Sequence, residues 1–269
     1  MEIRVFGDDL CDTGCIFLFV IICSRKKRLS CSATAVICYR KPIGKYTGTT
    51  EVNRRPQVVY VDNMQSDKGV KDLLQHPIVS EAITRLERHL PTQLTYHSIE
   101  HSLDVIRESI GLASDDALSA RETELLAIAS AWHDIGYIHT PHNNEPLAAK
   151  SLCEYLRDNK DYSADEVSLL RQMILDTALI PHGNTLIQSP STNLSRYLLD
   201  ADLANFGRDD FFEKSELQRK EVGAALEPFQ KSTLALLQAH NWLTPAATRK
   251  WSAKKEANLK ALVALIDNE

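Results

Sequence analysis

The sequence predicts an all-α protein, in which one compact helical domain follows a short extension of different character. Beyond Ser66 the apolar residues recur at three- and four-residue steps, which is the spacing of an amphipathic helix. Two capping-box sequences, Ser119–Glu122 and Ser163–Glu166, stand directly before such runs. The chain has 269 residues, enough to bury a substantial core. We therefore expect roughly seven to nine helices over residues 64–269.

The extension comprises residues 1–63, which hold five of the six cysteines and none of the nine histidines. Its apolar run Cys15–Cys23 is too short to span a bilayer as a helix, which needs ~20 residues, and the acidic residues before it argue against a signal peptide. We expect a poorly structured segment that is disordered or not native, with Met64 as a natural translation start. The alternatives are a short membrane-associating segment or a redox tail.

The helices follow one another with recognisable starts and stops. The first begins near Pro77, because proline suits a first helical turn, and its apolar residues continue to Leu90. The second is expected from His97 to Ile110, and the two capping boxes begin helices at Ser119 and Ser163. Further helices are expected at 144–158, 193–206, 209–240 and 244–266. Glycine and proline mark the breaks, at Gly111, Pro141, Pro181–Gly183, Pro190 and Pro245.

The overall composition excludes several classes of protein. Apolar residues make up 43% and charged residues 25%, so collagen-like, disulfide-scaffold and wholly disordered chains are excluded. The formal net charge is −5, and no basic footprint indicates nucleic-acid binding. Because no apolar stretch is long enough to span a membrane, we expect a cytoplasmic protein.

Residues of metal-binding type gather in the helical part. His97 and His101 are four residues apart, which places both imidazoles on one face of the expected helix. His133 and Asp134 are adjacent in apolar sequence. On a helix they would point about 100° apart, so both can reach one ion only if it lies between their directions.

A pair of aspartates, Asp200 and Asp202, lies in a third apolar segment. They point about 200° apart on a helix, so only one of them can face a shared site. An ionised aspartate among apolar residues is unfavourable unless it is paired or binds a metal. Three such anomalies in one domain favour a common site over three separate structural roles. The histidines interpreted as ordinary core or surface residues are His76, His89, His139 and His240.

The chain carries a histidine, then a His-Asp doublet and then an aspartate. This order resembles the motif of the HD-domain superfamily of metal-dependent phosphohydrolases. The segment 96–105 is similar to the Tyr-His-Asn-x-x-His-x-x-Asp-Val stretch of cyclic-nucleotide phosphodiesterases, and Asp200–Gly207 resembles the closing segment of small bacterial members. The resemblance extends over roughly residues 70–230. It implies an HD-type fold and chooses Asp202 over Asp200 as a ligand. The metal ligands that it implies are His101, His133, Asp134 and Asp202.

The resemblance implies further roles. His97 falls where the phosphodiesterases keep a general acid, and Glu145 belongs to an Asn-Glu segment like that of small bacterial members, where it would contact a metal-bound water or a second ion. His142 and His182 remain open as extra ligands or ordinary loop residues. Mixed histidine and carboxylate ligation suits a divalent ion (Mn, Fe, Co, Ni, Zn or Mg), and we expect one firm ion with a weaker second one.

The expected function is metal-dependent hydrolysis of a phosphate ester. The ion would activate a water that Asp134 or Asp202 orients, and His97 would protonate the departing oxygen. A nucleotide, as a monoester or a cyclic phosphodiester, is the small phosphorylated substrate that the resemblance implies. Two alternatives remain, a non-catalytic metal-containing regulatory or binding module and a di-iron oxygenase of the same fold. Candidate contacts for the phosphate are Lys150, Arg171, Arg196 and Arg208.

Overall fold

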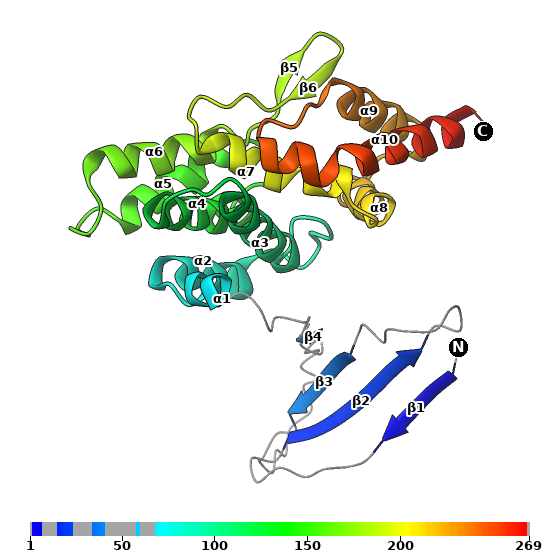
Figure 1. Ribbon diagram of the computed structural model, residues 1–269, viewed down its shortest axis with the longest axis horizontal. Coiled ribbons are helices and arrows are strands. Elements are labelled where there is room, and N and C mark those ends of the chain that lie inside the picture. Colours follow the sequence, from blue (N-terminus) through cyan, green and yellow to red (C-terminus); the bar gives the residue numbers. More distant parts are fainter. Residues whose placement is uncertain (1, 7–14, 24–33, 41–57, 60–67, 268–269) are drawn as a thin grey trace. The chain divides into compact units, whose positions relative to one another are not determined.

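The computed structural model of the chain describes residues 2–6, 15–23, 34–40, 58–59 and 68–267 (Figure 1). It divides into two compact units, Met1–Lys68 and Gly69–Glu269, and each is described by itself. Among the described residues, no helix is both long enough and apolar enough to cross a membrane.

The described residues of the first unit form a four-stranded antiparallel sheet in the order β1-β2-β3-β4. The apolar run of the extension is its long strand β2, with Glu2 opposite Cys23 on one side and Arg40 opposite Cys15 on the other. The strands are β1 (Glu2–Phe6), β2 (Cys15–Cys23), β3 (Thr34–Arg40) and β4 (Val58–Val59). The expectation of a poorly structured or non-native extension falls mostly on residues outside the described ones.

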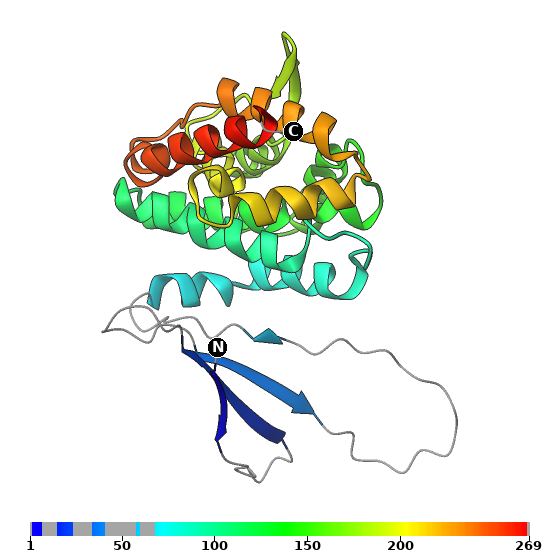
Figure 2. The ribbon, with the colours of Figure 1, turned by 90° about the vertical axis from the view of Figure 1, so that its right-hand side faces the viewer.

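The second unit is built from helices, so the predicted all-α class is confirmed. Its described residues form ten α-helices, two 3-10 helices and one small hairpin, which projects from the helices in both views (Figures 1 and 2). The α-helices are α1 (Lys68–Leu74), α2 (Pro77–His89), α3 (Ile99–Asp115), α4 (Ala120–Trp132), α5 (Glu145–Tyr155), α6 (Ala164–Leu175), α7 (Ser195–Asp202), α8 (Phe211–Glu221), α9 (Leu226–Ala239) and α10 (Pro245–Asp267). The remaining elements are η1 (Ile135–Ile138), β5 (Ile180–His182), β6 (Thr185–Ile187) and η2 (Ala204–Gly207).

Local sequence signals account for most helix starts. Both predicted capping boxes form: the hydroxyl of Ser119 accepts from the backbone N–H of Glu122, whose carboxylate accepts from the backbone of Ser119 at 2.9 Å. Ser163 and Glu166 repeat this arrangement at the start of α6. Each box satisfies N–H groups that a helix start leaves without partners.

The described residues hold ten α-helices where seven to nine were expected, and three expected boundaries are wrong. Helix α3 continues through Gly111, where a break was expected, and ends at Asp115. The single helix expected over 209–240 is two helices, α8 and α9, because Gly223 between them adopts a left-handed conformation with φ of 65°. The second helix begins at Ile99 rather than at His97. Ser98 has an extended backbone and its side chain accepts from the N–H of His101, so it caps α3 and leaves His97 outside the helix.

The core brings together the three segments that carry the predicted ligands. Helix α3 packs against both α4 and α7. A buried hydrogen bond of 2.8 Å between Ser109 and Ser130 joins α3 to α4. Trp132, which is fully buried at the end of α4, donates from its indole to the carbonyl of Ile78 in α2 at 2.9 Å. These contacts hold the end of α4 in place, which is where the His-Asp doublet follows.

Candidate metal centre

His101, His133, Asp134 and Asp202 lie together at the junction of α3, α4 and α7. Nε2 of His101 is 3.4 Å from a carboxylate oxygen of Asp134 and 3.3 Å from one of Asp202. Nε2 of His133 is 3.2 Å from Asp134 and 3.6 Å from Asp202. His101, His133 and Asp134 form a buried group that could hold a metal ion, and the half-buried Asp202 lies beside it.

The end of α4 explains how two adjacent residues reach one point. The helix ends at Trp132, and Asp134 has φ of −100° and ψ of 6°, outside helical geometry. His133 itself keeps helical angles, with φ of −57° and ψ of −37°, so the backbone leaves the helix only at Asp134. The point that both side chains reach therefore lies between their two directions. The chain turns here into η1, where Gly136 packs so closely that a Cβ would lie 2.0 Å from the carbonyl oxygen of Asn144.

The hydrogen bonding of His133 leaves one nitrogen ready for a cation. Its Nδ1 lies 2.7 Å from the carbonyl of Ser130, which can only accept, so Nδ1 carries the proton. Nε2 then presents a lone pair toward the cluster, and neither this atom nor the neighbouring Oδ2 of Asp134 has a hydrogen-bond partner. Two buried acceptors that face each other without a donor are unfavourable alone, and a shared cation satisfies both. The residues present therefore fit a metal ion.

The electrostatics of the cluster also favour a positive charge. Burial by itself lowers the pKa of His133, but the carboxylates of Asp134 and Asp202 outweigh it and raise that pKa well above its usual range. Burial raises the pKa of Asp202, but the two imidazoles outweigh it and hold that pKa below its usual range. Protons and a metal ion would thus compete for the same site.

Asp200 and Asp202 have different surroundings, although they are two residues apart on α7. Asp202 faces the imidazoles, and its second oxygen accepts from the side-chain amide of Gln188 at 2.6 Å. Asp200 points away and is fully buried. It accepts from the backbone N–H groups of Leu243 and Thr244 at 2.9 and 2.8 Å and from the Thr244 hydroxyl at 2.7 Å, which anchors the start of α10.

His97 borders the cluster from the segment before α3. Its ring lies 5.8 Å from that of His101, centre to centre, and stacks on Tyr137 at 4.0 Å. Its Nδ1–H donates to Glu221, whose other oxygen accepts from the backbone N–H groups of Tyr96 and His97 at 2.8 and 3.0 Å. The hydroxyl of Tyr137 lies 3.0 Å from Nε2 of His97. Burial lowers the pKa of His97, but Glu221 outweighs it and raises that pKa.

The other predicted residues lie apart from this cluster. Glu145 begins α5. Burial raises the pKa of Tyr137, and the carboxylate of Glu145 adds to this only after those of Asp134, Asp202 and Glu221. Among the described residues no hydrogen bond or ion pair joins Glu145 to the four clustered side chains. His142 and His182 are exposed. Of the candidate phosphate contacts, Arg208 is bound by the carboxylates of Asp104, Glu108 and Asp210, and Arg196 donates to the carbonyl of Leu243.

Sequence reasoning missed Glu221, Tyr137 and Gln188. Glu221 is far from His97 in the chain, and its one local signal is a carboxylate at the carboxyl end of a helix, where the helix dipole disfavours it. Tyr137 follows the doublet closely, but nothing in the sequence distinguishes it from an ordinary apolar residue. Gln188 lies in a segment without periodicity. Each acquires its role only through tertiary packing.

No family model and no curated protein matches the sequence. Solved structures of similar fold are found. A structural-genomics target from Lactobacillus plantarum gives a TM-score of 0.51 at 15% identity, over 73% of this chain and 100% of that one. Bacillus subtilis YpgQ, in complex with ADP, gives 0.50 at 13% identity, over 71% and 97%. A predicted HD superfamily hydrolase from an uncultured Thermotogales bacterium gives 0.48 at 15% identity, over 73% and 98%.

These likenesses bear on the fold. The first two structures are covered almost completely, so their whole architecture is matched by the helical part of this chain. At 13–15% identity they do not transfer an activity. The described helical unit therefore shares its fold with the Lactobacillus plantarum and Bacillus subtilis proteins.

Proposed function

We propose that the chain is a metal-dependent phosphohydrolase that acts on a small phosphate ester. The observation that carries this proposal is the buried group of His101, His133 and Asp134, with Asp202 beside it, in which Nε2 of His133 and Oδ2 of Asp134 lack any donor. Such a donor set suits Mn, Fe, Co, Ni, Zn or Mg. One firm ion would be held by His101, His133, Asp134 and Asp202. A weaker second ion would lie beside Glu145.

A bound divalent ion would supply Lewis acidity toward a water and toward a phosphate oxygen. The remaining steps belong to the protein's own groups. Asp134 and Asp202 would orient the attacking water, because each has a carboxylate in the cluster. His97 would act as the general acid. When protonated it carries a proton on Nε2, the atom that faces the Tyr137 hydroxyl, and this proton would pass to the departing ester oxygen.

Glu221 would position this acid. It accepts Nδ1–H of His97 and two backbone N–H groups beside it, so it holds both the ring and the segment that carries it. The side chain of Glu221 is only 6% exposed, which strengthens its interaction with a protonated imidazole. A site that only stored a metal ion would not need a buried carboxylate on a nearby histidine. This arrangement favours the enzyme over the regulatory module.

A nucleotide is the first substrate class to test. YpgQ, which has a similar fold, was solved with ADP bound, and the motif around His101 resembles that of cyclic-nucleotide phosphodiesterases. The di-iron oxygenase gains no support, because His142 and His182 are exposed and do not join the described cluster.

The test combines metal analysis with a panel of nucleotide monoesters, cyclic nucleotides and nucleoside diphosphates. Wild type is compared with the double variant His133→Ala/Asp134→Ala and with His89→Ala, an exposed histidine of α2 that serves as the matched control. We expect the double variant to lose metal and activity and the control to keep both. Bound metal without hydrolysis of any ester would indicate the regulatory module, whereas two irons with oxygen consumption would indicate the oxygenase. Full metal and activity in the double variant would refute the site.

A further inference from the structure

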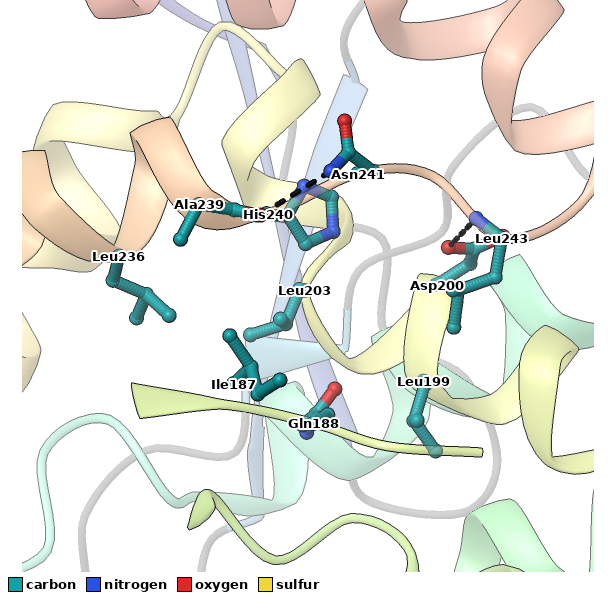
Figure 3. Close-up of a pocket in the computed structure, with 10 residues that line it drawn as sticks. All are labelled: Ile187, Gln188, Leu199, Asp200, Leu203, Leu236, Ala239, His240, Asn241 and Leu243. Carbon is teal, nitrogen blue, oxygen red and sulfur yellow. Dashed lines mark hydrogen bonds between the residues drawn. The ribbon is translucent and has the colours of Figure 1, made fainter. Parts of the chain in front are cut away.

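A cavity of about 170 Å³ lies between β6, α7, α9 and the segment that leads into α10 (Figure 3). Most of its wall is apolar and includes Leu199, Leu203 and Leu236. A buried cavity of about 150 Å³ with apolar walls is known to bind benzene. The present cavity is of similar volume but partly open to solvent, and it suits a molecule of about seven non-hydrogen atoms.

Two polar atoms in this wall lack partners. The amide of Gln188 donates to Asp202 and to the carbonyl of Thr177, but its Oε1 is buried and accepts no hydrogen bond. Nδ1 of His240 is also buried without a partner. In Figure 3 the two side chains approach the cavity from opposite sides. A buried polar atom without a partner costs about 1–3 kcal/mol, so two of them in one otherwise apolar cavity call for an occupant.

The charge state of the wall narrows the class of occupant. Burial lowers the pKa of His240 to about 3, so its ring is neutral at physiological pH. The carboxylate of Asp200 is also part of the wall, but it is already bound by three donors from Leu243 and Thr244. No free charge is left in the wall to attract an ion. Oε1 of Gln188 requires a donor, such as a hydroxyl or an N–H group.

We propose that this cavity is a binding site for a small, neutral, mainly apolar molecule with one hydroxyl or N–H group. The apolar body would contact the leucines, and the polar group would bond to Gln188 or His240. The site is separate from the one that carries the proposed hydrolysis, and its existence does not depend on that function.

The site also has a route to the metal cluster. The same amide that presents Oε1 to the cavity donates from Nε2 to the second oxygen of Asp202 at 2.6 Å. A donor on Oε1 polarises the amide and strengthens its N–H as a donor. Occupancy of the cavity would therefore alter Asp202, and by linkage metal binding would alter the affinity of the cavity for its ligand. This second part rests on the proposed metal site.

The experiment titrates the full-length chain by calorimetry with phenol and with toluene, which have equal numbers of non-hydrogen atoms and differ in the hydroxyl. We expect saturable phenol binding with Kd below about 1 mM and toluene binding at least about 5-fold weaker. Saturation by neither probe would mean that the cavity holds only water and would overturn the proposal. Equal affinities would overturn the polar part of the assignment.

Variants of the wall locate the binding. Ala239→Leu at the end of α9 fills the cavity with a good helix former, and Ala239→Ser is the matched control that leaves it open. Phenol binding should be lost in the first and kept in the second. If Ala239→Leu does not fold, Ile187→Phe fills the cavity from β6. Undiminished binding in a folded, filled variant would place the phenol elsewhere and refute the site.

A last arm repeats the phenol titration with Mn²⁺ present. We expect the Kd for phenol to change by about 2-fold or more, because both ligands act on the hydrogen bond between Gln188 and Asp202. Identical Kd values with and without Mn²⁺ would overturn the route to the metal cluster. Absence of bound Mn²⁺ by metal analysis, together with intact phenol binding, would refute the proposed metal site and leave the cavity standing.

Discussion

Asp200 and Asp202 offer the sharpest test of the site, because the same substitution two residues apart should have opposite consequences. In Asp202→Ala a carboxylate is lost 3.3 and 3.6 Å from the imidazoles of His101 and His133. In Asp200→Ala three donors at the start of α10 lose their acceptor. The first change should affect metal binding, and the second should affect the stability of the fold.

The magnitudes follow from linkage. A ligand at 100 times its Kd stabilises a fold by about 2.7 kcal/mol, which raises Tm by about 5–11 °C in a domain of this size. Removing a partner of a metal ligand costs about 10–100-fold in affinity, so removing a ligand itself should cost at least about 100-fold. In Asp202→Ala the same metal concentration then adds only about 0.4 kcal/mol, or about 1–2 °C. In Asp200→Ala the buried donors left unpaired lower stability by about 1–3 kcal/mol.

The assay is thermal unfolding of chelator-treated protein with and without Mn²⁺. Asp200→Ala should unfold at a lower temperature than wild type, yet show the full shift on addition of Mn²⁺. Asp202→Ala should unfold near the wild-type temperature without metal, because Gln188 keeps its second acceptor at Thr177, and should lose most of the shift. A full Mn²⁺ shift in Asp202→Ala, or a lost shift in a folded Asp200→Ala, would refute the assignment of the two residues.

Three further predictions concern the acid, the core and the turn after the doublet. Glu221→Gln should keep the metal but lower the pKa of His97. Because activity needs protonated His97, the fall in kcat on raising the pH should begin at a lower pH than in wild type, and a fall at the wild-type pH would contradict this. The pKa of His240 is about 3 in the fold against 6.5 when unfolded, so its contribution to stability is full above pH 6.5 and is lost as the pH falls toward 3. Between pH 7.5 and pH 4.5 the free energy of unfolding, measured with urea, should fall by about 2.7 kcal/mol more in wild type than in His240→Phe. Equal falls in the two proteins would contradict this prediction. Gly136→Ala should destabilise strongly, because its Cβ would lie 2.0 Å from a carbonyl oxygen, whereas Gly111→Ala, with open space in mid-helix, should stabilise by about 0.5–1 kcal/mol; equal Tm values for the two would be the wrong result.

The local parts of the fold were predictable from sequence. Helices with an apolar stripe and a capping box, such as α4 and α6, form for reasons contained within a few residues. The boundaries that were wrong depend on single backbone states. Gly223 takes a left-handed conformation that glycine permits but does not require, and Ser98 becomes a cap only because the chain before it is held elsewhere.

The site was predictable where a residue is anomalous by itself. Asp134 and Asp202 are carboxylates in apolar sequence, and such residues need a partner wherever they lie. Glu221 and Gln188 are ordinary surface-type residues in the sequence, and their roles come from contacts with segments far along the chain. No spacing rule relates a residue to a partner 124 positions away. The candidate ligands could thus be predicted because a carboxylate in apolar sequence is unfavourable without a partner, whereas Glu221 and Gln188 carry no such signal.

The charge balance of the cluster ties folding to metal binding. With neutral imidazoles, the carboxylates of Asp134 and Asp202 carry two negative charges, on side chains that are 11% and 16% exposed. Two nearby buried carboxylates repel each other and lose hydration, so the fold alone has to support an unfavourable arrangement. Protonation of His133 compensates for part of this charge, and a divalent ion compensates for all of it. Metal affinity should therefore rise with pH as the ion displaces that proton, and the stabilisation by metal should be largest where the proton no longer compensates.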